Sequence, residues 1–149
     1  MREMAREANK VVVWRVLEEI WGQSNVAVAE ELLAQDYKRH DPLFPSSVIG
    51  LRGFLEAYWK YDAIFADRRL NIEQVIEMGE TVVSRWSVRG TYRRPDSARV
   101  GAGRPVAITG VTISRVVDGF VVEEWAEWDS WGLVKQLGVI GSAELDVLI

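Results

Sequence analysis

The sequence contains no cysteine and only one histidine, His40, which disfavours two classes of site. Without cysteine there is no disulfide framework and no thiol chemistry. A zinc or iron site built on imidazoles needs more than one histidine, so we expect no bound metal.

The chain also lacks an excess of basic residues and a long apolar run. Its 18 Lys and Arg against 22 Asp and Glu give a formal net charge of −4, which argues against a nucleic-acid partner. No apolar run reaches the roughly 20 residues that span a bilayer. The N-terminal residues mix charges and lack the apolar core of a signal peptide, so we expect a cytoplasmic protein that does not enter a membrane.

What the sequence does have is apolar and aromatic bulk. Of its 149 residues 48% are hydrophobic, and seven are tryptophan. We therefore expect a single domain over residues 1–149, with a core at about 8–138 and a tail at 139–149. So much aromatic surface indicates a large core or a pocket for a hydrophobic small molecule.

The first half of the chain has the spacing of helices and the second half that of strands. Apolar residues recur at helical intervals from Glu3 to Trp21, a second helix is capped by Ser24 or Asn25 and runs to Leu33, and a third begins near Gly50. Residues 36–42 are interpreted as a polar connection. The expected strands are 70–77, 81–94, 106–117 and 120–128, with a loop at 95–105 and a last helix at 130–137. Helices followed by an antiparallel sheet are typical of the α+β class.

The last hairpin predicts which side chains share a face. If Asp118-Gly119 is a two-residue loop, Val117 pairs with Phe120, and the pairing continues with Thr112 opposite Trp125 and Gly110 opposite Glu127. The missing side chain at Gly110 would then leave room for a ligand. The opposite face would be apolar and is predicted to form a homodimer interface through Val111, Ile113, Val122, Ala126 and Trp128.

Two carboxylates near the end of this hairpin are candidates for acid-base chemistry. Glu127 and Asp129 are two residues apart on a strand, so they point the same way about 6.5–7 Å apart. Nearby tryptophans would disfavour their charged forms. The alternatives are that Asp129 is the N-cap of the last helix and that Glu127 is a solvated charge. His40 is either a proton shuttle or a turn residue bonded to backbone near Pro42.

Several segments resemble the SnoaL-like polyketide cyclase (ester cyclase) family. The run Trp-x-x-x-Asp-x-x-Gly-Leu-x-x-Gln-Leu-Gly at residues 125–138 is a fairly specific marker, and 108–119 precedes it in the same pattern. Asp36-Tyr37 with His40 and Pro42, Gly50–Phe54 and Val82–Thr91 follow the family order, so the resemblance covers about residues 8–138.

The resemblance implies a cone-shaped, cystatin-like α+β fold of the nuclear-transport-factor type. A strongly curved antiparallel sheet would wrap around the N-terminal helices and enclose a deep apolar pocket. Cyclases of this family close a ring by intramolecular aldol condensation on a polyketide ester, without a metal or organic cofactor. Their general base is an acidic residue on the last strand, and Asp129 is the matching position. The polar partner that they often place on the penultimate strand, commonly histidine, is missing here.

The leading hypothesis is therefore a cofactor-independent enzyme acting on a hydrophobic, carbonyl-bearing molecule. Asp129 would be the base, and His40 or a protonated Glu127 would donate a hydrogen bond to the enolate oxygen. The residues expected to contact the substrate are Trp125, Trp86, Trp59, Phe65, Phe44, Tyr37, Gly110 and Thr112.

Two other functions remain open. Related cone-fold epoxide hydrolases activate a water between two carboxylates bridged by an arginine, and Arg85, the nearest strand arginine, alternates away from Trp86. A binding module without catalytic activity would hold an apolar ligand and use Asp129 only as a cap.

Overall fold

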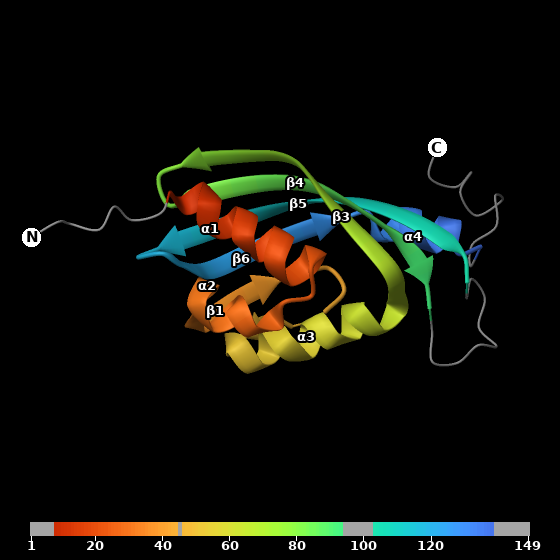
Figure 1. Cartoon of the computed structure of the whole chain (residues 1–149), viewed down its shortest axis with the longest axis horizontal. Coiled ribbons are helices and arrows are strands. Elements are labelled where there is room, and N and C mark those ends of the chain that lie inside the picture. Colours follow the sequence, from red (N-terminus) through yellow and green to blue (C-terminus); the bar gives the residue numbers. More distant parts are fainter. Residues whose placement is uncertain (1–7, 45, 94–102, 139–149) are drawn as a thin grey trace, which may run out of the picture.

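The computed structural model describes residues 8–44, 46–93 and 103–138. Most of the loop expected at 95–105 and the whole tail at 139–149 lie outside these residues. The fold is α+β, as predicted: helices cover one face of a six-stranded sheet that curls without closing (Figure 1).

The N-terminal helical segment crosses the inner face of the sheet. Helix α1 (Asn9–Arg15) continues as the π-helical segment η1 (Val16–Gly22), and the short η2 (Val26–Val28) and α2 (Ala29–Leu32) follow. Val12, Val13, Val16 and Ile20 are at most 2% exposed and begin the core. Helix α3 (Gly50–Ile64) starts where the sequence predicts and buries Phe54 and Tyr58. Among the described residues, no helix is long and apolar enough to cross a membrane.

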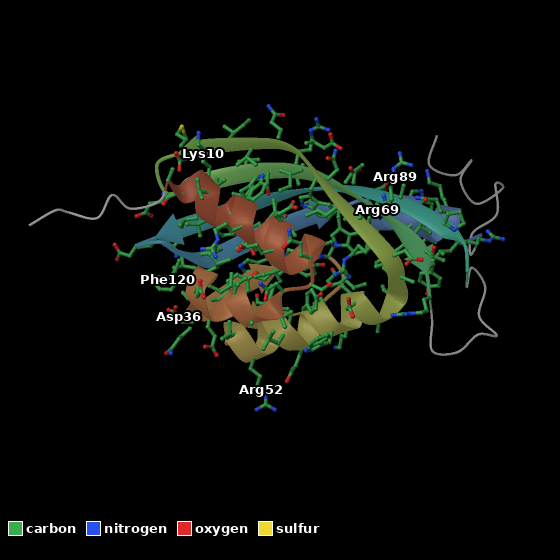
Figure 2. The ribbon with its side chains drawn as sticks, in the orientation of Figure 1. Lys10, Asp36, Arg52, Arg69, Arg89 and Phe120 are labelled. Carbon is green, nitrogen blue, oxygen red and sulfur yellow. The ribbon has the colours of Figure 1, made fainter. Side chains whose placement is uncertain are left out.

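The sheet has the order β2-β1-β6-β5-β4-β3. Its strands are β1 (Leu33–His40), β2 (Val48–Ile49), β3 (Phe65–Met78), β4 (Thr81–Tyr92), β5 (Pro105–Val117) and β6 (Phe120–Trp128), and helix α4 (Ser130–Gln136) follows. Neighbouring strands are antiparallel except β1 and β6, which run parallel. Figure 2 shows Arg69 and Arg89, which face each other across β3 and β4, on the outer side of the sheet.

The polar connection predicted at residues 36–42 is wrong, because most of it is strand β1. Tyr37 and Arg39 alternate inward and are buried, while Lys38 between them is exposed. The sequence hides this strand because its inward Arg39 is charged, and so is Asp41, which directly follows the strand and is also buried. Strand β3 likewise begins at Phe65 rather than Leu70.

The predicted hairpin register is wrong by one residue for most of its length. Asp118 and Gly119 form the expected two-residue turn, both with positive φ, and Val117 pairs with Phe120. A bulge then makes Val116 pair with Val121 but Arg115 with Glu123, so Val122 is the extra residue. Beyond it every β6 side chain points to the opposite face from the one predicted.

The shift exchanges the two faces of β6. Glu124 and Ala126 become buried, whereas Trp125 and Glu127 are exposed on the outer face. Trp128 turns inward and packs against the core. The proposed interface set is therefore corrected: Ala126 and Trp128 lie on the inner face, and only Val111 and Ile113 of that set stay as exposed outer-face residues of β5.

Candidate functional site

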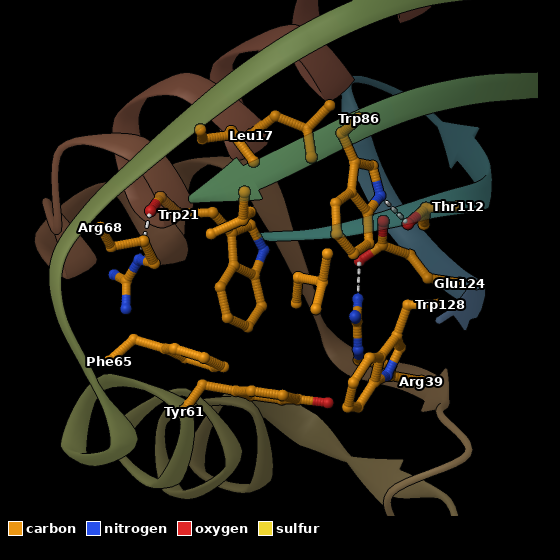
Figure 3. Close-up of a pocket in the computed structure, with 13 residues that line it drawn as sticks. Leu17, Trp21, Arg39, Tyr61, Phe65, Arg68, Trp86, Thr112, Glu124 and Trp128 are labelled. Atoms are coloured by element: carbon orange, nitrogen blue, oxygen red, sulfur yellow. Dashed lines mark hydrogen bonds and ion pairs between the residues drawn. The ribbon is translucent and has the colours of Figure 1, made fainter. Parts of the chain in front are cut away.

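A cavity of about 70 Å³ lies between the inner face of the sheet and the helices. Its walls are largely aromatic and aliphatic, with two arginines and one carboxylate among them. Figure 3 shows Trp21 near its centre, Arg68 on one side, and Arg39 with Glu124 on the other. The lining residues are Leu17, Trp21, Arg39, Tyr61, Phe65, Arg68, Leu70, Trp86, Val88, Ile108, Thr112, Glu124 and Trp128.

Glu124 is the acidic group of the cavity and is 3% exposed. The bulge at Val122 turns it inward, where Oε1 accepts a hydrogen bond from the Tyr37 hydroxyl at 2.6 Å. The Ser114 hydroxyl donates to Oε2 at 2.7 Å. Two neighbouring strands thus fix the orientation of this carboxylate.

Arg39 lies beside Glu124 because β1 runs parallel to β6 and the two residues are register partners. Its Nη1 is 3.5 Å from Glu124 Oε1, and its Nη2 is 3.2 Å from Asp41 Oδ2. The guanidinium also lies over the Trp21 ring, 5.4 Å from the centroid. One buried arginine therefore bridges two carboxylates.

The carboxylate of Asp41 accepts hydrogen bonds from several groups of the protein. The Tyr61 hydroxyl is 2.9 Å from both of its oxygens, and Trp128 Nε1 donates to Oδ1 at 3.1 Å. The Leu43 backbone N–H donates to Oδ1 as well. Asp41 thus anchors Tyr61 and Trp128, two walls of the cavity, and does not itself line it.

Three pKa values in this cluster are shifted. Burial, followed by the Glu124 charge, raises the pKa of Tyr37 well above its ordinary value, and burial with the Asp41 charge does the same to the pKa of Tyr61. Burial would lower the pKa of Arg39, but the oxygens of Tyr37, Glu124 and Asp41 around it raise that pKa by more. At neutral pH both phenols are therefore protonated donors and Arg39 is a cation.

The sequence suggested that the missing side chain at Gly110 leaves room for a ligand, but the structure shows no such space. A Cβ at this position would collide with the Trp86 ring and lie 2.9 Å from Trp128 Cβ, so the two indoles fill the space. Trp86 Nε1 donates to Thr112 Oγ1 at 3.0 Å, which fixes the Trp86 ring beside the cavity. Trp86, Phe65 and Thr112 line the cavity, as expected from the sequence for residues that contact the substrate.

Other residues expected at the site lie elsewhere. Asp129 is the N-cap of α4, where its Oδ1 accepts from Gly132 N–H at 2.7 Å, and it is not a lining residue. Trp59 is 54% exposed on α3, and Phe44 contacts Tyr61 edge-on without lining the cavity. Tyr37 lies behind Glu124 and reaches the cavity only through it.

The remaining three lie on the outer face of the sheet. His40 stacks on Trp125 with ring centroids 5.5 Å apart, and its Nδ1 is 3.2 Å from Ser47 Oγ. Its Nε2 is 3.7 Å from Glu123. Glu127 is exposed two residues beyond Trp125. Because β6 is shifted by one residue, neither Trp125 nor Glu127 reaches the cavity.

Sequence reasoning missed Glu124, Arg39 and Asp41, which form the polar part of the cavity wall and its support. Tyr37, Arg39 and Asp41 occupy alternate positions, as do side chains that share one face of a strand. Because charged residues on a buried face need partners, this pattern could have pointed to Arg39 and Asp41. Among the described residues, no group of three or more His, Asp or Glu side chains is arranged to hold a metal ion.

Comparisons with known proteins agree with this architecture. The family model for SnoaL-like polyketide cyclase matches residues 11–137. IdmH of Streptomyces antibioticus, a proposed polyketide cyclase, is 26% identical, with a TM-score of 0.76 over 89% of this chain and 99% of that one.

More distant structures share the fold. A proposed SnoaL-like polyketide cyclase from Jannaschia sp. CCS1 is 20% identical, with a TM-score of 0.78 over 95% of this chain and 99% of that one. AclR of Streptomyces galilaeus, a proposed hydroxylase, is 18% identical, with a TM-score of 0.75 over 89% of this chain and 97% of that one. No curated protein shows a significant match to the sequence.

Proposed function

The chain belongs to the SnoaL-like polyketide cyclase family, and we propose that it is an enzyme in which Glu124 takes a proton from a carbon next to a carbonyl. The observation that carries the proposal is the place of Glu124: it is the one carboxylate among the lining residues of a largely apolar cavity. The substrate class follows from the walls, which suit a largely apolar molecule that bears carbonyl oxygens.

In this proposal Glu124 is the general base and Arg39 stabilises the oxyanion. Within the described residues Glu124 Oε2 has Ser114 as its one donor, so a lone pair remains to accept the substrate proton. Arg39 lines the same cavity, and in this proposal its remaining N–H groups donate to the developing enolate oxygen. Asp41 and Trp21 hold that guanidinium in place.

The proposed step balances without a redox partner. The C–H electron pair of the substrate becomes the enolate double bond as the proton moves to Glu124 Oε2. The enolate carbon then attacks a second carbonyl of the same molecule and forms the ring C–C bond. The resulting alkoxide takes the proton back from Glu124, which restores the carboxylate.

The test compares two candidate bases in the same protein. Aromatic polyketide esters, β-dicarbonyl compounds and terpene epoxides are screened by thermal shift, and each hit is assayed for turnover and for deuterium uptake at the acidic carbon by NMR. We expect Glu124→Gln to lose about 10²–10⁴-fold in rate, as for removal of a general base. Asp129→Asn keeps a good N-cap and should retain most of the activity.

Glu127→Gln is the matched control, because it removes a carboxylate from the exposed face of the same strand. If Asp129→Asn abolished turnover while a folded Glu124→Gln kept it, the base would be Asp129 and the proposal would be wrong. Ligands that stabilise all the variants equally with no turnover of any hit would favour a binding module.

A second candidate function rests on the bridge between Glu124 and Asp41. Epoxide hydrolysis in this fold uses an arginine between two carboxylates, and Arg39 rather than the exposed Arg85 has that place here. Glu124 would then activate a water for attack on the epoxide carbon. If the terpene epoxides were the only screened compounds that turned over, the result would favour epoxide hydrolysis. The cytoplasmic location expected from the sequence stays a prediction.

A further inference from the structure

Arg68 is the second cation of the cavity wall, and the proposed proton transfer gives it no role. It lines the cavity, and its side chain is only 9% exposed. Figure 3 shows it on the far side of Trp21 from Arg39 and Glu124. A buried charge is costly unless it is paired and hydrogen-bonded, so the groups around Arg68 indicate what it binds.

A bulge in strand β3 brings Arg68 to the cavity. Two residues, Asp67 and Arg68, lie opposite the single residue Gly90 of β4. In a regular strand Phe65 and Arg68, three positions apart, would point to opposite faces, but with the extra residue both line the cavity. Asp67 adopts a positive φ of 52°, and a Cβ at Gly90 would lie 2.9 Å from the Ala66 carbonyl oxygen. The bulge therefore depends on this local backbone, and it turns Arg68 inward.

The surroundings of the Arg68 guanidinium are rich in donors and poor in acceptors. Its Nε donates to the Trp21 carbonyl oxygen at 3.0 Å, and its Nη2 donates to the hydroxyl oxygens of Tyr58 at 3.1 Å and Ser24 at 3.3 Å. Within the described residues neither of these hydroxyl groups donates to an acceptor. One of the two N–H groups on Nη1 has no acceptor there either. Several donors therefore gather where an anion could accept from them.

The charge of Arg68 is also less compensated than that of Arg39. Arg39 lies between two buried carboxylates, those of Glu124 and Asp41. The one carboxylate that pairs with Arg68 in the described part of the chain is Asp62, with Oδ1 3.3 Å from Nη1 and a side chain that is 36% exposed. Such a partly exposed ion pair is weak, so an incoming carboxylate can displace Asp62 toward solvent at little cost.

We propose that Arg68 binds a carboxylate of the substrate, so that the cavity takes a largely apolar acid rather than the corresponding ester. This inference rests on the proposed function, because it names the substrate class of the same cavity. The carboxylate accepts from Nη1 of Arg68, and the Tyr58 and Ser24 hydroxyl groups rotate toward the added charge. The reacting carbon then lies at the other end of the cavity, beside Glu124. The lining residues carry two arginines and one glutamate, so a single negative charge balances them.

The test compares acids with their esters in the full chain. Benzoate, 2-naphthoate and the methyl ester of each are titrated at pH 7 by calorimetry and ligand-observed NMR. We expect the wild type to bind each acid about tenfold or more tightly than its ester, as for hydrogen bonds to a charged group. Arg68→Met keeps an apolar stem and should lose this preference, whereas Arg68→Lys keeps the charge and should retain part of it. Tyr58→Phe should weaken the binding of the acids and leave that of the esters unchanged.

Arg69→Met is the matched control, because it removes the same charge one residue along the strand, where the side chain is exposed. It should keep the preference for acids, and circular dichroism with thermal melts checks that each variant folds. A wild type that binds neither acid, or that binds acid and ester equally, overturns the proposal. A preference that survives in a folded Arg68→Met variant also overturns it, since Arg39 would then be the anion site.

Glu124→Gln separates this proposal from the proposed function. It removes the candidate base and one negative charge of the cavity, so it should keep or increase the preference for acids. A loss of that preference in Glu124→Gln would contradict the assignment to Arg68. Because the affinities are measured without turnover, a wrong base and a wrong carboxylate site give different results.

Discussion

At the scale of residues, the cavity holds a buried ion pair that is costly to keep. Taking Arg39 and Glu124 out of water has a desolvation cost that their attraction offsets only in part, so such pairs are weak contributors to stability. Here Tyr37, Ser114 and Asp41 take up part of the remaining hydrogen-bonding capacity of the pair. The pair is therefore better explained by chemistry in the cavity than by folding.

Gly110 gives the sharpest stability prediction for a single residue. In Gly110→Ala the new methyl group meets the Trp86 ring, which its hydrogen bond to Thr112 holds in place. We expect the free energy of unfolding to fall by about 1–3 kcal/mol, as in other overpacked cores, measured by urea denaturation.

The control is Gly53→Ala on helix α3, where the added Cβ would lie 3.4 Å from Val48 Cγ1. That contact is ordinary and alanine favours the helix, so this variant should be neutral or more stable. Equal stability of Gly110→Ala and the wild type would show that the Trp86 ring moves aside freely.

At the scale of elements, one inserted residue decides what strand β6 presents to the cavity. Val122 bulges out between two normal stretches of pairing, and the residues after it change face. The apolar pattern of β6 fits both registers, because Trp125 is apolar on one side and Ala126 and Trp128 are apolar on the other. Glu124 became the candidate base through this shift, and Glu127 moved to the outer surface.

Asp129 has a defined structural role at the start of α4. Its side chain accepts the Gly132 N–H, and Gly132 has no space for a Cβ beside that carboxylate. We expect Asp129→Ala to lower the free energy of unfolding by about 1 kcal/mol, whereas Asp129→Asn should stay close to the wild type. Chemical denaturation of the three proteins measures this. If Asp129→Asn lost as much stability as Asp129→Ala, the negative charge rather than the hydrogen bond of the cap would stabilise the N-terminus of α4.

At the scale of the whole molecule, the buried phenols make stability depend on alkaline pH. Tyr37 and Tyr61 have raised pKa values in the folded protein, so they ionise in the unfolded chain first. Their contribution is complete below the unfolded pKa of about 10 and is lost as pH rises above it, because unfolding then releases protons. We expect the free energy of unfolding to fall steadily above pH of about 10.

Denaturant melts at increasing pH, followed by tyrosinate absorbance, measure this effect. Tyr61→Phe should show a shallower decline with pH than the wild type, although the loss of its bond to Asp41 lowers its stability at neutral pH. If Tyr37 and Tyr61 both titrated in the folded protein with an ordinary pKa, the prediction would be wrong.

The sequence by itself determined the class, the family and the local turns. The Asp118-Gly119 hairpin, the start of α3 at Gly50 and the α+β order follow from local chemistry, since turn residues, caps and apolar periodicity act within a few positions. Trp86 and Thr112 were correctly expected at the cavity because strands β4 and β5 were placed correctly, whereas Phe65 lines it from a strand whose predicted start, Leu70, was too late.

Only the tertiary structure decided which carboxylate the cavity receives. A bulge changes the face of every following side chain, and its position depends on how β6 pairs with two strands at once. Strand β1 depends on the same long-range pairing, because Arg39 and Asp41 become acceptable inside only when Glu124, Tyr61 and Trp128 surround them. These partners lie far apart in the chain, so no local pattern could place them together.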